Sequence, residues 1–258
     1  MQNTPALQPE QRRAPSAGTT WLAQLERKIR IKTRRFRRAR VISIDGIRLE
    51  VDRSRLSPEV VRALYHERYE AKEAALVREV LIPGDRVLEI GAGIGFVTLL
   101  CARRCGPKAV LSYEANPENE VLIRRNFELN GLFPQLRSRA ISVESDEREL
   151  FVAKNLLSTS FLDRGESTGT PVQCDAIADV VEQFRPNSIV MDVEGAEIDL
   201  LPAAPLDGID KIILETHPHI VGDVAVTVLD AHLLAHGFVR QRRNLGKVRL
   251  YLRPRSQN

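Results

Sequence analysis

The sequence is poor in cysteine, in aromatic side chains and in long apolar runs. Of its 258 residues, three are cysteine and 5% are aromatic. An odd and small number of cysteines does not build a disulfide framework, so we expect a reducing compartment and a cytoplasmic location. No run approaches the roughly 18 apolar residues of a membrane-spanning helix. We find no apolar stretch behind the first basic residues, which argues against a secretory signal.

Charge is abundant and unevenly distributed. Hydrophobic residues make up 43% of the chain and charged residues 28%, which is typical of a globular protein with a sizeable core. The formal net charge is +4, yet residues 1–40 hold 11 Lys or Arg against two acids. Residues 41–258 therefore carry 27 basic against 32 acidic side chains. The body of the protein is acidic, and nucleic acid is an unlikely partner for it.

Residues 1–40 form a basic arm that we expect to be partly disordered. Residues 1–20 are rich in Pro, Gln, Ala, Ser and Thr, which predicts disorder. Nine Lys or Arg lie between Arg27 and Arg40, with apolar residues among them. The arm is either a solvated, partly helical segment or a contact for an anionic surface or a partner protein. The basic residues are not confined to one helical face, which weakens a membrane interpretation.

An N-terminal extension is expected over residues 41–82. Apolar and polar residues alternate around Asp45-Gly46, which predicts a β-hairpin. Ser57-Pro58-Glu59 has the features of a helix start, namely a capping Ser, a Pro in the first turn and an early acid. We expect this helix to continue to Leu81, where Pro83-Gly84 ends it.

The remainder, residues 83–258, alternates between short apolar segments and amphipathic ones. Strands are expected at 86–90, 109–113, 136–143, 189–193 and 211–214. Helices are expected at 94–104, 117–130, 175–184 and 224–236. This alternation predicts an α/β, Rossmann-like domain with a mostly parallel sheet. Residues 238–243 and 247–252 flank a turn and predict a closing antiparallel hairpin.

A glycine-rich loop, Gly91-Ala92-Gly93-Ile94-Gly95, follows an expected strand and opens an expected helix. Phe96 stands where a dinucleotide fingerprint needs a small residue, which disfavours a pyrophosphate ligand. Glu89, just before the glycines, suits an ammonium group, and Glu114 at the next strand end suits ribose hydroxyls. These features together describe S-adenosylmethionine (SAM). A ligand-free turn and a solvent-exposed acid are the structural alternatives.

The loop Glu89–Gly95 resembles motif I of class I SAM-dependent methyltransferases, whose seven-stranded sheet ends in an antiparallel hairpin. More narrowly, residues 69–238 resemble the FkbM family. The matching segments are 91–95, 113–117, 126–131, 191–197 and 214–218. The most specific of them is Met191-Asp192-Val193-Glu194-Gly195-Ala196-Glu197. The resemblance implies that SAM is held by Glu89, Gly91, Ala92, Gly93, Gly95, Glu114, Ala115, Asn116, Ala140 and Asp192.

A second group of polar residues ends the fourth and fifth strands. Asp192 should face the ligand edge of the sheet, with Glu194 on the same side in extended geometry. Glu215 and His217 end the neighbouring strand, and crowded carboxylates mark functional sites more often than cores. We expect Asp192, Glu194 and His217 to align the methyl acceptor and remove its proton. The structural alternatives are a helix-capping Glu197 and a His217 that packs against Pro218.

The acceptor is expected to be a hydroxyl of a small molecule or glycan, which makes the reaction an O-methylation. Residues 192–195 lack the Pro-Pro-aromatic sequence typical of methylation at base amines, and the acidic surroundings suit a phosphate backbone poorly. The acids could hold a divalent cation, but their spacing is not diagnostic and we assign no metal ligand. Two other functions remain open. One is an RNA-directed methyltransferase recruited by the arm, and the other is a non-catalytic module of the same fold.

Overall fold

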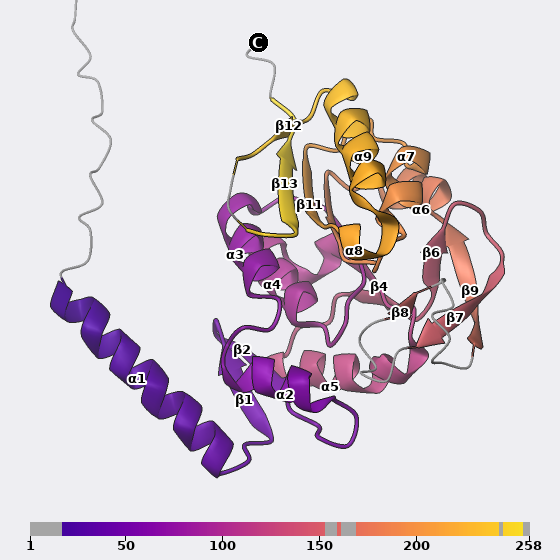
Figure 1. The fold of residues 1–258 in the computed structure, drawn as a ribbon. Coiled ribbons are helices and arrows are strands. Elements are labelled where there is room, and N and C mark those ends of the chain that lie inside the picture. Colours follow the sequence, from indigo (N-terminus) through magenta and orange to yellow (C-terminus); the bar gives the residue numbers. More distant parts are fainter. Residues whose placement is uncertain (1–16, 153–158, 161–168, 243–244, 255–258) are drawn as a thin grey trace, which may run out of the picture. The chain divides into compact units, whose positions relative to one another are not determined.

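The structure, a computed structural model, describes residues 17–152, 159–160, 169–242 and 245–254 (Figure 1). The chain divides into two units, residues 1–39 and residues 40–258. The described part of the first unit is helix α1 (Ala17–Phe36) with the turn that follows it. Disorder was expected over residues 1–20. Residues 1–16 lie outside the described residues, and residues 17–20 are helical.

A seven-stranded sheet forms the centre of the larger unit, in the order β12-β13-β11-β10-β3-β4-β5. The strands are β3 (Val87–Ile90), β4 (Val110–Tyr113), β5 (Gln135–Arg137), β10 (Ser188–Met191), β11 (Lys211–Glu215), β12 (Val239–Arg240) and β13 (Val248–Leu252). Strands β5, β4, β3, β10 and β11 run parallel. Strand β13 is antiparallel to both β11 and β12. The expected mostly parallel sheet with a closing antiparallel hairpin is confirmed.

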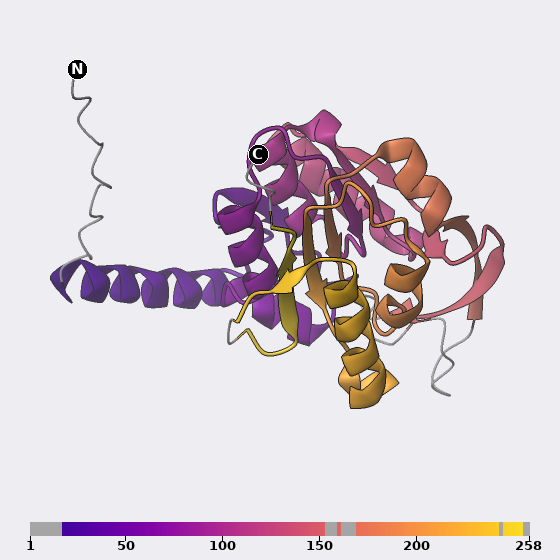
Figure 2. The same cartoon turned by 90° about the horizontal axis from the view of Figure 1, so that it is seen from above.

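Helices lie on both sides of this sheet (Figures 1 and 2). They are α4 (Phe96–Cys105), α5 (Glu120–Asn130), α6 (Ile177–Phe184), α7 (Glu197–Ala203), the short α8 (Pro218–Val221) and α9 (Asp223–Ala235), with 3-10 turns at Pro107–Ala109 and Pro117–Asn119. Strands β3, β4 and β10 are buried along their whole length, as parallel strands covered on two faces should be. Among the described residues, no helix is long and apolar enough to cross a bilayer.

A second, four-stranded sheet corrects one expectation. It contains β6 (Ala140–Ser142), β7 (Glu147–Val152), β8 (Thr159–Ser160) and β9 (Gly169–Ala176), in the order β6-β9-β7-β8. The expected single strand 136–143 is therefore wrong. The chain leaves the main sheet after Arg137, and Ala140 then pairs with Cys174 on β9. Apolar alternation predicts a strand but does not say which sheet receives it.

The N-terminal extension belongs to the larger unit. Strands β1 (Val41–Ile44) and β2 (Ile47–Glu50) form the expected antiparallel hairpin. Asp45 and Gly46 both have positive φ, as a tight two-residue turn requires. The expected helix from Pro58 to Leu81 is in fact two helices, α2 (Pro58–Tyr65) and α3 (Ala71–Val80). Glu67 and Glu70 adopt left-handed backbone conformations, with φ of 56° and 44°, and these interrupt the helical hydrogen bonding.

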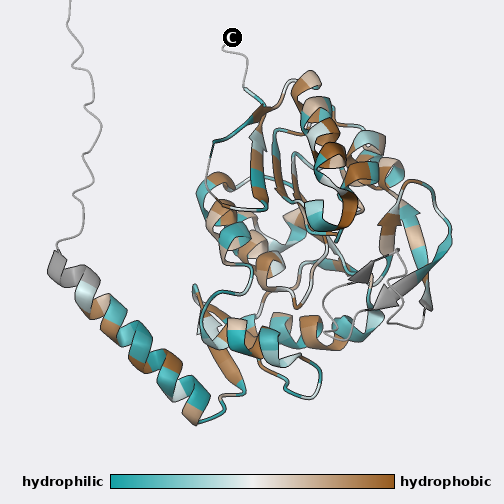
Figure 3. Cartoon of the chain, viewed as in Figure 1, coloured by the Kyte–Doolittle hydropathy of each residue, from teal (hydrophilic) through white to brown (hydrophobic). Residues whose placement is uncertain are grey.

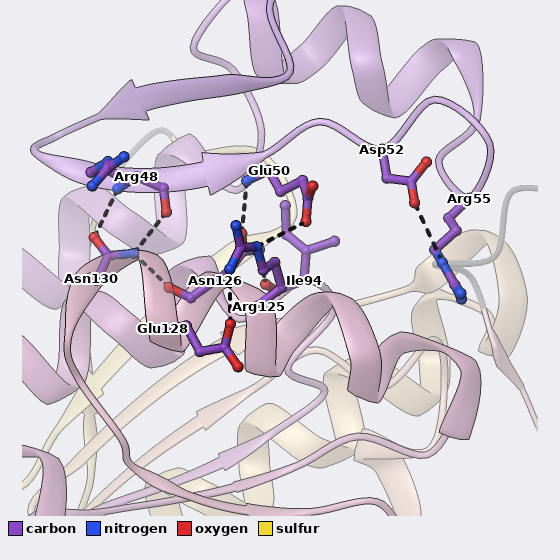
Figure 4. Close-up of polar contacts among 9 residues, drawn as sticks. All are labelled: Arg48, Glu50, Asp52, Arg55, Ile94, Arg125, Asn126, Glu128 and Asn130. Atoms are coloured by element: carbon purple, nitrogen blue, oxygen red, sulfur yellow. Dashed lines mark hydrogen bonds and ion pairs between the residues drawn. The ribbon is translucent and has the colours of Figure 1, made fainter.

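Two asparagines of α5 fasten the hairpin to the domain (Figure 4). Asn126 is fully buried, and its Oδ1 accepts a hydrogen bond from the backbone N–H of Glu50 at 2.7 Å. Its Nδ2 donates to the carbonyl of Ile94 in the glycine-rich loop at 2.8 Å. Asn130 accepts from the N–H of Arg48 and donates to the carbonyl of the same residue. Asn126 therefore ties the extension to the loop that opens α4.

Candidate active site

The carboxyl ends of β3, β4, β10 and β11 meet at one edge of the sheet. The strand order reverses between β3 and β10, because β4 and β5 lie on one side and β11 on the other. Open α/β sheets bind ligands in the crevice at such a switch point. The residues that directly follow these four strands are Gly91, Glu114, Asp192 and Thr216.

The glycine-rich loop and the end of β10 are in backbone contact. Gly91 has a φ of 94°, and a Cβ added at this position would clash with the carbonyl oxygen of Asp192. The N–H of Asp192 also donates to the carbonyl of Ile90 at 2.9 Å. Only glycine fits at position 91, because a side chain would push the two strand ends apart.

Glu89 lies within β3 and faces α4. It is 1% exposed, and its Oε2 accepts hydrogen bonds from the hydroxyls of Thr98 and Ser112. Burial raises the pKa of Glu89 to about 7, although the two hydroxyl donors oppose the shift. The other carboxylate oxygen, Oε1, is buried without a hydrogen-bond partner.

Glu114 follows β4 and organises the loop around it. Its Oε2 accepts from the N–H of Gly93 at 2.8 Å, and its Oε1 accepts from the N–H of Asn116 at 2.9 Å and from Asn119 Nδ2 at 3.1 Å. Burial raises the pKa of Glu114 against these hydrogen bonds. Ala115, next in sequence, packs against the buried cluster that contains Ala140. The structure thus brings the expected cofactor residues to one end of the sheet.

Tyr69 and Glu70, between α2 and α3, cover the glycine-rich loop. A Cβ built on Gly93 would lie 2.6 Å from the Tyr69 hydroxyl and 3.1 Å from Glu70 Oε1. Three carboxylate oxygens around the loop are buried without a hydrogen-bond partner, namely Glu70 Oε2, Glu89 Oε1 and Asp192 Oδ1. Buried acceptors of this kind suit a positively charged ligand, and SAM carries an ammonium and a sulfonium group.

His217 lies among three acids and is 3% exposed. Its Nε2 is 3.5 Å from Asp192 Oδ1 and 3.8 Å from Glu194 Oε2. On the other side of the ring, Nδ1 is 3.4 Å from Glu197 Oε1. The expected convergence of Asp192, Glu194 and His217 is present. Glu194 is not extended as expected, because its φ of 48° places it in a left-handed turn before Gly195.

Glu197 is fully buried at the first turn of α7. Its Oε1 accepts from the N–H of His217 and its Oε2 from the N–H of Gly195, both at 2.8 Å. It therefore links its own helix start to the end of β11. Its pKa is lowered, because hydrogen bonds and the charge of His217 outweigh the effect of burial.

The site is rich in negative charge. Burial and the neighbouring charge of Glu215 raise the pKa of Asp192, while the charge of His217 opposes the shift. The pKa of His217 is raised in turn. Burial works against that shift, but the close contact of the ring with Glu197 and the charges of Asp192 and Glu194 outweigh it. Asp192, Glu215 and His217 each offer one ligand atom within 4.8 Å of the others, an arrangement that could take a cation.

A cavity of about 660 Å³ opens beside Glu194 and Gly195. Its walls come from β6, β7, residues 193–196, α7 along its length and the end of α8, and they are mostly apolar. The polar side chains in the lining are Ser142, Arg148, Glu194 and Asp199. Arg148 was not predicted as a site residue, because β7 reaches this cavity only through the second sheet. Residues 155–170, a further candidate for the lining of an acceptor pocket, lie largely outside the described residues.

Comparison with known proteins identifies the family. Residues 89–254 match the model of the methyltransferase FkbM domain. The chain therefore belongs to the FkbM family of methyltransferases, and its cofactor is SAM. A search of curated proteins found no match.

Several solved structures are similar over much of the chain at low sequence identity. A ribosomal protein L11 methylase from Lactobacillus delbrueckii subsp. bulgaricus is 15% identical, with a TM-score of 0.41 over 71% of this chain and 77% of that one. A precorrin-6y C5,15-methyltransferase from Geobacter metallireducens is 13% identical, with a TM-score of 0.42 over 80% and 94%. A SAM-dependent O-methyltransferase from Thermotoga maritima is 14% identical, with a TM-score of 0.41 over 72% and 66%.

Proposed function

We propose that this methyltransferase acts on a hydroxyl of a small molecule or glycan. One observation carries the proposal. His217 is buried with Asp192 and Glu194 at one ring nitrogen and Glu197 at the other, and Glu194 of this cluster also lines the cavity. An imidazole held by acids on both sides is suited to accept a proton and to be stabilised once it is charged.

The cofactor half of the site would be formed by the glycine-rich loop and Glu114. Gly91 and Gly93 let a ligand approach the backbone, and Glu89 Oε1, which has no hydrogen-bond partner, would face its positive groups together with Asp192, which also lies near His217. SAM supplies the methyl group when it is bound. Glu114 holds the N–H groups of the loop, and we infer that its carboxylate also orients the ribose.

The acceptor half would be formed by His217 and its acids. A neutral His217 takes the hydroxyl proton at Nε2, the nitrogen that faces Asp192 and Glu194. Glu197, at Nδ1, fixes the ring and stabilises the imidazolium that results. Proton removal leaves the acceptor oxygen as the stronger nucleophile, aligned for an in-line displacement.

The cavity supports a compact acceptor. Its volume of about 660 Å³ is in the range of sites for small molecules, and its mostly apolar walls carry a few polar groups that could orient a ligand. The cluster of acids opposes a phosphate backbone, so RNA fits the site poorly. A non-catalytic module would have no use for a buried imidazole with acids on both sides.

Transfer of a labelled methyl group from SAM to a panel of hydroxyl-bearing metabolites and glycans tests the proposal. His217→Gln should lower kcat by about 100-fold while SAM binding is kept, since a positioned base contributes about 10²–10⁴-fold. The same assay after treatment with a chelator decides whether a cation at Asp192, Glu215 and His217 assists. Transfer only to amines or only to RNA would contradict the proposal.

Calorimetry with S-adenosylhomocysteine tests the cofactor half separately. Glu114→Ala should weaken binding about tenfold or more, because it removes the acceptor of three loop hydrogen bonds and the proposed ribose contact. Glu118→Ala, an exposed acid four residues further on, is the matched control and should bind as the wild type does. Equal affinities in the two variants would exclude a role for Glu114.

A further inference from the structure

Helix α1 carries its exposed large apolar side chains on one side, whereas the half-buried Ile31 lies outside this sector. At 100° per residue, Trp21, Leu22, Leu25, Ile29 and Phe36 all fall within about 100° of the helix circumference. All five are exposed, from 40% for Leu25 to 91% for Phe36. Brown apolar residues alternate with teal hydrophilic ones along α1 in Figure 3. A stripe of five exposed apolar side chains marks an interaction surface, because such side chains are normally packed against a core.

The rest of the helix is strongly basic. Residues 17–36 contain six Lys or Arg and a single acid, Glu26. Lys32 lies within the apolar sector and Lys28 beside it, which is why the basic residues are not confined to one face. Lysine tolerates this position at a lipid surface, because its aliphatic stem packs along apolar groups while its ammonium group extends to the phosphates. The placement of the apolar residues, rather than of the basic ones, is therefore the informative pattern.

We propose that α1 lies flat on the surface of an anionic lipid bilayer, with the apolar stripe inserted at the level of the headgroups. Its 20 residues span about 30 Å, and its composition rules out a span across the bilayer. Acidic headgroups attract the basic side chains of α1 that lie near the lipid surface. A phosphate backbone would use the basic side chains but not five exposed apolar ones. An interfacial amphipathic helix uses both.

Co-sedimentation of the full-length protein with vesicles tests this inference without any measurement of activity. The protein should bind vesicles that contain phosphatidylglycerol and should bind phosphatidylcholine vesicles weakly. Leu25→Ala together with Ile29→Ala keeps the charge and does not lower the helix propensity, and should lower partitioning by about tenfold or more through lost apolar burial. Gln24→Ala, an exposed change outside the stripe, is the matched control and should bind as the wild type does.

Three results would overturn the inference. The first is equal partitioning of the double variant and the wild type into anionic vesicles, which would leave only non-specific charge attraction. The second is a salt-sensitive RNA complex that the double variant forms as well as the wild type, in the absence of vesicle binding. The third is a dimer in analytical ultracentrifugation that the double variant abolishes, which would make a second copy of the chain the occupant of the stripe.

Discussion

Glu197 holds His217 at two points. It accepts a hydrogen bond from the backbone N–H of His217 at 2.8 Å and lies 3.4 Å from Nδ1 of the ring. The two residues are 20 positions apart, on α7 and just after β11, so neither element alone fixes the imidazole. Glu197 is thus a positioning residue for the proposed base, and it is also the acid that would stabilise the charged ring.

Glu197→Gln should lower kcat by about tenfold or more and leave KM for SAM nearly unchanged, since the change removes the charge behind the base and not the cofactor loop. The amide can still accept one backbone hydrogen bond, so the fold should persist. Steady-state kinetics measures the effect. Glu182→Gln, an exposed acid on α6, is the control. A variant with wild-type kcat would show that Glu197 serves the helix start alone.

The rate of transfer should rise with pH through the raised pKa of His217. Below that pKa the ring is protonated and cannot accept the acceptor's proton, and above it the rate should level off. Glu197→Gln removes an anion, so the pKa of His217 should fall and the rising limb should move to lower pH. A pH profile of kcat for both proteins checks the shift. Because the acids around His217 interact with it, the measured pKa belongs to the cluster. An identical limb in both proteins would contradict the assignment of the base.

Glu89→Gln should make the unfolding free energy less dependent on pH. The pKa of Glu89 is about 7 in the folded protein against 4.5 as its ordinary value. Between these values the folded state keeps a proton that the unfolded state has lost, so rising pH destabilises the wild type, by up to about 3 kcal/mol. The unfolding free energy of the variant relative to the wild type, measured by urea denaturation, should therefore be higher at pH 8 than at pH 5. Glu118→Gln, which is exposed, should show no such difference.

Asn126→Ala should destabilise the larger unit by about 2–4 kcal/mol. The change leaves the N–H of Glu50 and the carbonyl of Ile94 without their hydrogen-bond partner. A backbone group that is buried without a partner lowers the stability by about 1–3 kcal/mol. Asn130→Ala, whose hydrogen bonds to Arg48 are exposed, should cost about 1 kcal/mol or less. Denaturant titration compares the two variants. Equal losses would mean that the bond to the glycine-rich loop adds nothing.

The main sheet was predictable because its strands are short apolar segments separated by helices of regular length. The hairpin was predictable because Asp45-Gly46 suits a two-residue turn. The break in the helix before β3 was not predictable, because Glu67 and Glu70 have no intrinsic preference for the left-handed backbone that they adopt. The division of residues 136–143 between two sheets depends on the distant partner β9, which local alternation does not encode.

The acids of the candidate site could be gathered from the sequence, since parallel strands bring their carboxyl ends to one edge. The contacts that these acids make with one another and with His217 could not be predicted. The sequence places Glu197 either among the acids at this edge or as a cap of its own helix, but it does not predict the hydrogen bond from the N–H of His217. Asn126 carried part of the family resemblance without an assigned role, and the structure shows that it joins Glu50 to Ile94. Contacts between side chains and a distant backbone leave no periodic signal in a sequence.

The contact between Gly91 and the carbonyl of Asp192 has a consequence for specificity. The loop that would hold the methyl donor and the strand end that would hold the acceptor meet backbone to backbone, so the spacing between them is set by the main chain rather than by side chains. Substitutions cannot tune that spacing without moving both strands. A change of acceptor would therefore have to come from the cavity walls, where α7, β6 and β7 contribute side chains that can be exchanged while the reacting groups stay in register.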